Sequence, residues 1–173
     1  MKAIPALFAL IALALPAFAA DKKDKDQSSA SVPDANISKV TWAEVVNGAP
    51  FDKEGLAGKV VVVEEWGVNC GPCIASLPDM AKLAKRYDKK GLVVVGLERQ
   101  NGTKEQILKL TKPARVEYPV MAGGYSGVPS EGIPHAMVYG VDGKLIWHGH
   151  PANGEFEDAV KDALKAVAPK PAK

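Results

Sequence analysis

The chain carries two cysteines, separated by two residues, between a predicted buried strand and a predicted helix, and no other feature restricts its fold as much. Residues 60–63 are consecutive valines, which is typical of a strand buried on both faces of a parallel sheet. After Cys73, apolar residues recur at helical spacing, so the pattern predicts a helix that Pro78 should kink. Cys70 is therefore expected where a central strand has ended and a helix begins.

Further strands and helices are predicted to alternate along the chain. Residues 37–46 include apolar side chains, but their pattern does not distinguish a helix from a strand. Asp142-Gly143 is a strong hairpin signal. The alternation predicts a mostly parallel α/β sheet, to which the hairpin adds antiparallel strands. The expected strands are 92–97, 118–121, 136–139 and 144–147, and the expected helices are 103–112 and 156–167.

The N-terminal residues differ in composition from the rest. Residues 1–19 contain one lysine, an apolar run and the small-x-small pattern Ala17-Phe18-Ala19, which predicts a signal peptide, with an uncleaved membrane anchor as the alternative. Residues 20–36 are rich in charge and serine and are interpreted as a flexible linker. One domain is expected at 37–168, followed by a tail at 169–173. This organisation predicts export to the bacterial periplasm or the exterior of the cell envelope.

The composition excludes some classes of partner and cofactor. The formal net charge is +2, and no basic patch alternates with aromatic residues, so nucleic acid is not expected as a partner. A structural disulfide usually closes a longer loop than Cys70 and Cys73 would close, so this pair is interpreted as a bridge that opens and closes. A zinc site would need a second cysteine pair, which the sequence lacks. No metal is expected, and no cofactor beyond a redox-active disulfide of Cys70 and Cys73.

The position of Cys70 predicts its chemistry. Unpaired N–H groups and the dipole at a helix N-terminus stabilise an anion, so the pKa of the Cys70 thiol should be lowered and its attacking thiolate favoured. Cys73 is expected in the first turn and better shielded. Cys70 should therefore attack a partner disulfide, and Cys73 should then attack the mixed disulfide and release the product.

The stretch VVVEEWGVNCGPCIASLP, residues 61–78, resembles the thioredoxin superfamily, and specifically its exported TlpA-like and ResA-like thiol–disulfide oxidoreductases. Trp66 and Pro78 lie where that family has them, and Ile133-Pro134 matches its cis-proline. The resemblance covers residues 59–168. It implies a thioredoxin fold, a mixed sheet flanked by helices. The long spacing between Cys73 and Pro134 suits the strand–helix insertion of the TlpA-like branch.

The resemblance also implies site residues. A cis Pro134 would expose the backbone groups of Ile133, which pair with an extended substrate chain beside the first cysteine. Glu64 matches a buried acid that exchanges a proton with the second cysteine. Glu65 is not expected to share this role, since adjacent strand residues point to opposite faces, and either acid alternatively marks the solvated end of the strand.

Other residues are expected to border the docking surface. These are Gly71 and Pro72 between the cysteines, and Asn69, which replaces the tryptophan usual in the branch and suggests a different partner. Trp66 is expected to wall the site, chiefly by packing. Members that serve cytochrome c maturation commonly carry a glutamate where this chain has Ser76, so apocytochrome is not carried over as substrate.

The leading hypothesis is reduction of disulfides in exported proteins. Gly-Pro between the cysteines is the dipeptide of thioredoxin. The reduction potential of thioredoxin is roughly −270 mV, against about −120 mV for the oxidant DsbA. A protein disulfide would be the substrate, and a membrane-bound electron donor, reached by transient membrane association, would recharge the protein. Two alternatives remain open: a dithiol oxidase or isomerase, and a Cu(I) chaperone that uses the cysteines and His135. His135 either tunes the thiolate or is solvated, and His148 and His150 are expected at the surface.

Overall fold

The computed structural model describes residues 32–168. The expected signal peptide at 1–19, most of the expected linker at 20–36 and the tail at 169–173 lie outside the described residues. Ala35, two residues before the expected start of the domain, already pairs with the sheet, because its carbonyl oxygen accepts the N–H of Leu145 at 2.8 Å. No helix among residues 32–168 has the length and apolar character that crossing a membrane requires.

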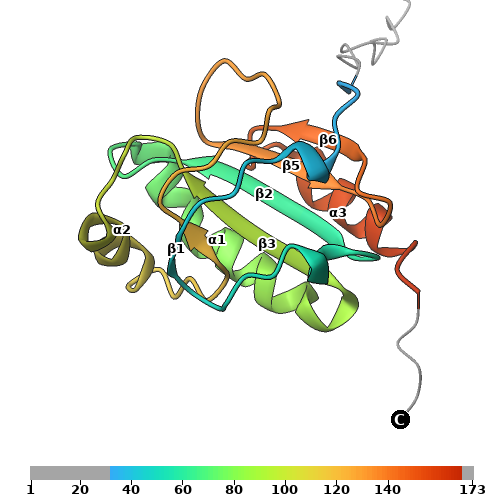
Figure 1. Cartoon of the computed structure of the whole chain (residues 1–173), viewed down its shortest axis with the longest axis horizontal. Coiled ribbons are helices and arrows are strands. Elements are labelled where there is room, and N and C mark those ends of the chain that lie inside the picture. The colour runs from blue at the N-terminus through green and yellow to red at the C-terminus, as the bar shows by residue number, and fades with distance from the viewer. Residues whose placement is uncertain (1–31, 169–173) are drawn as a thin grey trace, which may run out of the picture. The chain divides into compact units, whose positions relative to one another are not determined.

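A six-stranded sheet, in the order β1-β4-β3-β2-β5-β6, forms the centre of the described part (Figure 1). The strands are β1 (Val45–Asn47), β2 (Val60–Trp66), β3 (Leu92–Glu98), β4 (Val120–Met121), β5 (His135–Tyr139) and β6 (Leu145–Gly149). The α-helices are α1 (Gly71–Tyr87), α2 (Lys104–Thr111) and α3 (Gly154–Leu164). Single 3-10 turns are formed by Ile37–Lys39, Glu54–Leu56 and Asp88–Lys90.

The sheet is mixed, as expected. β3 pairs in parallel with both β2 and β4, whereas β2–β5, β5–β6 and β1–β4 are antiparallel. The expected fold class, a mixed sheet flanked by helices, is confirmed, and the segment whose helix or strand character the sequence left open contains the start of the strand β1. Its three residues are too few to show a period, and only its pairing with β4 identifies it.

β2 lies in the middle of the sheet, and all seven of its residues are buried. Because side chains alternate along a strand, β2 contributes to both cores. Val60, Val62 and Trp66 pack on one face, and Val61 and Val63 on the other. The register pairs Glu64 with Gly96 and Trp66 with Glu98 on the neighbouring strand β3.

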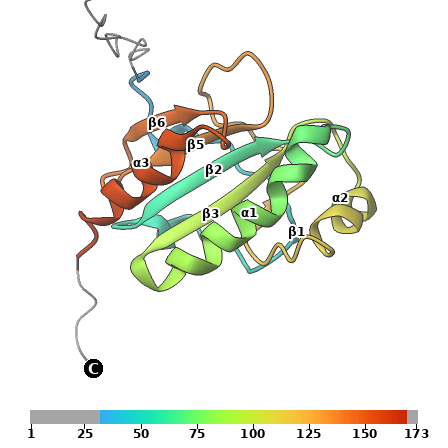
Figure 2. The same cartoon turned by 180° about the vertical axis from the view of Figure 1, so that it is seen from behind.

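The two faces of the sheet are covered differently. α1 and α3 lie side by side on one face (Figure 2), where Leu77 and Val160 are fully buried. α1 continues through Pro78 without interruption. On the other face, residues of the irregular N-terminal segment, among them Val40 and Leu56, join the core. One face of the sheet is therefore covered by helices and the other by a segment with little regular structure.

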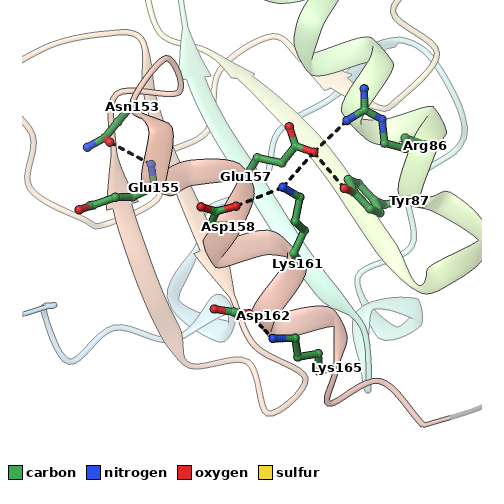
Figure 3. Close-up of polar contacts among 9 residues, drawn as sticks. All are labelled: Arg86, Tyr87, Asn153, Glu155, Glu157, Asp158, Lys161, Asp162 and Lys165. Carbon is green, nitrogen blue, oxygen red and sulfur yellow. Dashed lines mark hydrogen bonds and ion pairs between the residues drawn. The ribbon is translucent and has the colours of Figure 1, made fainter.

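A polar contact joins α1 to α3 (Figure 3). Glu157 accepts hydrogen bonds from the Tyr87 hydroxyl at 2.9 Å and from Arg86 Nη1 at 2.8 Å. The Tyr87 hydrogen bond and the nearby Lys161 and Arg86 cations lower the pKa of Glu157. These bonds fix the last turn of α1 against the first turn of α3.

The segment between β3 and β5 contains α2 and β4. The predicted capping box at the start of α2 is confirmed: Thr103 Oγ1 accepts the Gln106 N–H at 3.3 Å, and Gln106 Oε1 accepts the Thr103 N–H at 2.8 Å. Ile107 anchors the helix in the core with no exposed surface. β4 then extends the sheet beside β3.

Candidate active site

Cys70 occupies the N-cap of α1, at the end of the short turn that follows β2. A disulfide joins it to Cys73, with the two Cα atoms 5.2 Å apart. Cys70 Sγ also accepts the backbone N–H of Cys73 at 3.2 Å. Cys70 is 8% exposed and Cys73 is 0% exposed, so only the first sulfur can be reached from outside. The N–H of Cys73, in the first turn of α1, thus donates to the sulfur that the sequence predicts as the attacking thiolate.

The Ile133–Pro134 peptide bond is cis, and it lies beside the disulfide. The carbonyl oxygen of Ile133 is 3.7 Å from Cys70 Sγ. Ile133 is half-buried, and Pro134 is buried immediately before β5. An extended chain that pairs with the backbone of Ile133 would consequently pass close to the reactive sulfur.

Glu64 is fully buried on the face of the sheet that α1 covers. Burial raises its pKa to about 7, although hydrogen bonds from Ser76 and Tyr118 favour the carboxylate. Ser76 Oγ lies 3.2 Å from Glu64 Oε1 and 2.8 Å from the carbonyl oxygen of Cys73. A hydroxyl has one hydrogen, so both contacts are satisfied when a protonated Glu64 donates to Ser76 while Ser76 donates to Cys73.

Glu65 faces the other side of the sheet. Its carboxylate accepts the backbone N–H of Ser126 at 2.7 Å, and its second oxygen lies 3.7 Å from Arg99 Nε. At 3% exposure it does not mark a solvated strand end, and neither does Glu64. Of the two adjacent acids, only Glu64 contacts the helix that carries the cysteines.

The residues expected at the docking surface divide into two groups. Asn69, Gly71 and Pro72 are exposed around Cys70. Trp66 has no exposed surface, which agrees with the expected packing role and leaves no surface of its own for contact with a substrate. It belongs to the face of β2 that packs under α1, which makes it a core residue.

The histidines do not assemble with the cysteines. His135 is 4% exposed, which rules out the solvated interpretation, and its register opposite Glu65 puts it on the face away from α1. Its Nε2 lies 3.1 Å from Nδ1 of half-buried His148, and burial together with His148 lowers the pKa of His135. His150 is exposed, as expected, whereas His148 is not a free surface residue. Within residues 32–168, no three His, Cys, Asp or Glu side chains are grouped to hold a metal ion.

Sequence reasoning missed two features of this region. Glu98, at the end of β3, is a fully buried acid that bonds the turn before Cys70. The only signal for it was an acid that continues a strand of buried apolar residues. The second feature is a groove of about 530 Å³ that begins at Pro72 and runs between α1 and the β6–α3 loop. Its lining comes from two segments that are distant in sequence, so no local pattern predicts it.

Comparison with known proteins gives consistent matches. The Redoxin family model matches residues 19–132. A thiol-disulfide oxidoreductase ResA of Bacillus cereus is 27% identical over 108 residues, which cover 58% of this chain and 60% of that protein. The protein SUPPRESSOR OF QUENCHING 1 of Arabidopsis thaliana is 32% identical over 158 residues, 85% of this chain but 14% of that protein.

A solved structure matches more completely. The thiol:disulfide interchange protein of the thioredoxin family from Chlorobium tepidum TLS is 26% identical, with a TM-score of 0.63. The match covers 79% of this chain and 99% of that one. The match spans less than two thirds of the length of either curated relative above.

Proposed function

Because the chain belongs to the Redoxin family, in the ResA-like branch of the thioredoxin superfamily, we propose that it reduces disulfides of exported proteins by dithiol–disulfide exchange. One observation carries the proposal. The bond between Cys70 and Cys73 lies at the N-terminus of α1, with the first sulfur 3.7 Å from the carbonyl oxygen of Ile133. A reactive sulfur and a backbone docking edge are thus side by side.

The first step uses the reduced protein. The Cys70 thiolate, stabilised by the N–H groups of α1, attacks one sulfur of a substrate disulfide. A bond forms between Cys70 Sγ and that sulfur, the substrate disulfide breaks, and the other substrate sulfur leaves as a thiolate that takes a proton from water. The product of this step is a mixed disulfide.

The second step regenerates the internal bond. Cys73 loses its proton to Glu64, whose pKa of about 7 lets the carboxylate act as a base near neutral pH. The Cys73 thiolate attacks Cys70 Sγ, the bond between Cys70 Sγ and the substrate sulfur breaks, and that sulfur leaves as a thiolate that takes a proton from water, while Glu64 releases its proton to water. The substrate has then gained two electrons and two protons, and Cys70 and Cys73 are oxidised.

Docking is assigned to the surface around Cys70. An extended substrate segment would pair with the backbone of Ile133, while the exposed Gly71, Pro72 and Asn69 contact its neighbouring residues. The side chain at position 69 would then influence which substrates are accepted. No metal and no separate cofactor are needed, since the cysteine pair itself carries the electrons.

The direction of electron flow and the cellular location of the protein are part of the same proposal. Export rests on the sequence of residues 1–19, and the reductant would be a membrane-bound dithiol that the protein meets transiently. A dithiol oxidase or isomerase would use the same atoms with electrons flowing the other way. Equilibration with glutathione measures the reduction potential of the cysteine pair and so distinguishes a reductase from an oxidase or isomerase. A reduction potential above about −180 mV would contradict the reductase assignment. Nothing in the described site favours a Cu(I) chaperone, because His135 lies on the opposite face.

Trapping experiments test the proposal directly. Cys73→Ser should hold partners as mixed disulfides through Cys70, because the resolving sulfur is gone. Cys70→Ser should trap none, since Cys73 is 0% exposed. Non-reducing gels of both variants, with the double variant as control, provide the measurement. Equal trapping by the two single variants would contradict the assigned roles.

A further inference from the structure

Glu98 is a buried carboxylate to which the exchange reaction above assigns no role. It ends β3, has no exposed surface and lies beside Trp66 in the sheet. Three backbone N–H groups donate to it: those of Val68 at 3.1 Å and Gln100 at 2.9 Å to Oε1, and that of Gly102 at 2.7 Å to Oε2. A carboxylate that accepts three N–H bonds is firmly oriented, because each oxygen has a fixed partner.

These bonds connect two turns that are distant in sequence. Val68 belongs to the turn that leads from β2 to Cys70, whereas Gln100 and Gly102 belong to the turn after β3. Glu98 therefore holds the approach to the reactive cysteine against the next strand.

A second bond reinforces the same connection. Gln100 Oε1 accepts the backbone N–H of Asn69 at 2.7 Å, one residue before Cys70. The two turns are tightly packed. A Cβ on Gly67 would lie 2.4 Å from the Gln100 side chain, and a Cβ on Gly102 would lie 2.6 Å from Val68. Two consecutive N–H groups before Cys70 are thus fixed from β3 and its turn.

We propose that Glu98 is a positioning residue for Cys70, which it acts on by fixing the backbone of residues 68 and 69. The inference rests on the proposed exchange function and adds a residue to it. With this turn held, Cys70 Sγ stays over the N–H groups of α1 and 3.7 Å from the Ile133 carbonyl oxygen. A loosened turn would let the sulfur leave both, and its thiolate would lose stabilisation.

Glu98→Gln is the test substitution. The amide has nearly the same volume as the carboxylate but only one acceptor oxygen, so its NH2 group would face a backbone N–H where the carboxylate accepts one. Glu65→Gln is the matched control. Glu65 is also a buried acid that accepts a backbone N–H, and it lies on the other face of the sheet. General destabilisation should affect both variants.

The readout is the pH profile of Cys70 alkylation by iodoacetamide, measured in the Cys73→Ser background so that one thiol reports. We expect the midpoint of the Glu98→Gln profile to move upward and the alkylation rate at pH 7 to fall about fivefold or more, whereas Glu65→Gln stays within twofold of its parent. Urea titration confirms that each variant is folded under the assay conditions.

Each alternative outcome has a separate meaning. An unchanged profile in folded Glu98→Gln would overturn the positioning role and leave the exchange function intact. A faster reaction would also overturn it, since removal of the negative charge would then outweigh any loss of position. If the parent thiol itself reacts no faster than free cysteine, the proposed function fails first.

Discussion

At the scale of single residues, Glu64 has two properties that suit its proposed role as a base for Cys73. Burial raises the pKa of Glu64 to about 7, so its two protonation states are both populated near neutral pH. Ser76 contacts Glu64 Oε1 and the Cys73 carbonyl oxygen, which ties the acid to the first turn of α1.

The raised pKa of Glu64 predicts a pH-dependent stability. Below about pH 4.5 the carboxyl is neutral in both states, so its contribution to stability is fully present there. As pH rises towards 7 the unfolded chain ionises first, and up to about 3 kcal/mol is lost. Glu64→Gln should remove this loss. Urea unfolding of both proteins from pH 4 to pH 8 measures the difference, and parallel curves would show that the Glu64 pKa is ordinary.

The same residue should affect the second step of exchange. Without a base, Cys73 loses its proton to water, so Glu64→Gln should accumulate the mixed disulfide and slow its release about tenfold or more at pH 7. The first step, read as Cys70 alkylation, should change much less. Quenched-flow gels with a disulfide peptide separate the two steps. Equal slowing of both would assign Glu64 to the environment of Cys70 instead.

At the scale of elements, the turn after β3 has two roles. It carries the backbone groups that bond Glu98, and it ends at Thr103, the N-cap of α2. The start of α2 and the turn before Cys70 are therefore connected through a few residues. Because the capping box is local, its contribution to stability can be separated experimentally from the effect of Glu98 on the reactivity of the Cys70 thiol.

Removal of the cap should lower stability and spare the chemistry. Thr103→Ala loses the acceptor for the Gln106 N–H, so the free energy of unfolding should fall by about 1 kcal/mol. The pH profile of Cys70 alkylation should not move. Urea unfolding and alkylation of the same preparation check both parts, with Ser130→Ala, at an exposed position of the 122–132 loop, as control. A shifted profile would mean that α2 itself positions the turn.

At the scale of the whole described domain, one strand connects two different cores. β2 sends alternate side chains into a helix-covered core and into a core covered by irregular chain. All of its residues are buried, so neither core can lose its packing without exposing part of the central strand. The two faces should consequently unfold together.

Substitutions on either face test this coupling. Leu77→Ala, in the core under the helices, and Met137→Ala, in the opposite core, remove fully buried side chains and should each cost about 3 kcal/mol. Both variants should still unfold in one transition, seen equally by far-UV circular dichroism and by tryptophan fluorescence. A variant in which the two probes separate would show that one core survives without the other.

Several parts of the fold and site follow from local sequence signals. Continuous apolar runs predict β2 and β3 because these strands are buried on both faces, and apolar residues at every third or fourth position predict α1 and α3. The cap of α2 and the turn between β5 and β6 depend on residues a few positions apart. For the same reason, the sequence places Cys70 at the start of a helix. β1 was not predicted, since its three residues form a strand only by pairing with β4, which is distant in sequence.

The sequence by itself therefore determined the order of elements and the cysteine pair at a helix N-terminus, since both are set by neighbours along the chain. Tertiary structure alone decided the surroundings of the polar side chains. It buried Trp66, paired His135 with His148 and gave Glu98 three N–H partners from two turns. Those contacts join residues that folding brings together, and no periodicity along the chain records them.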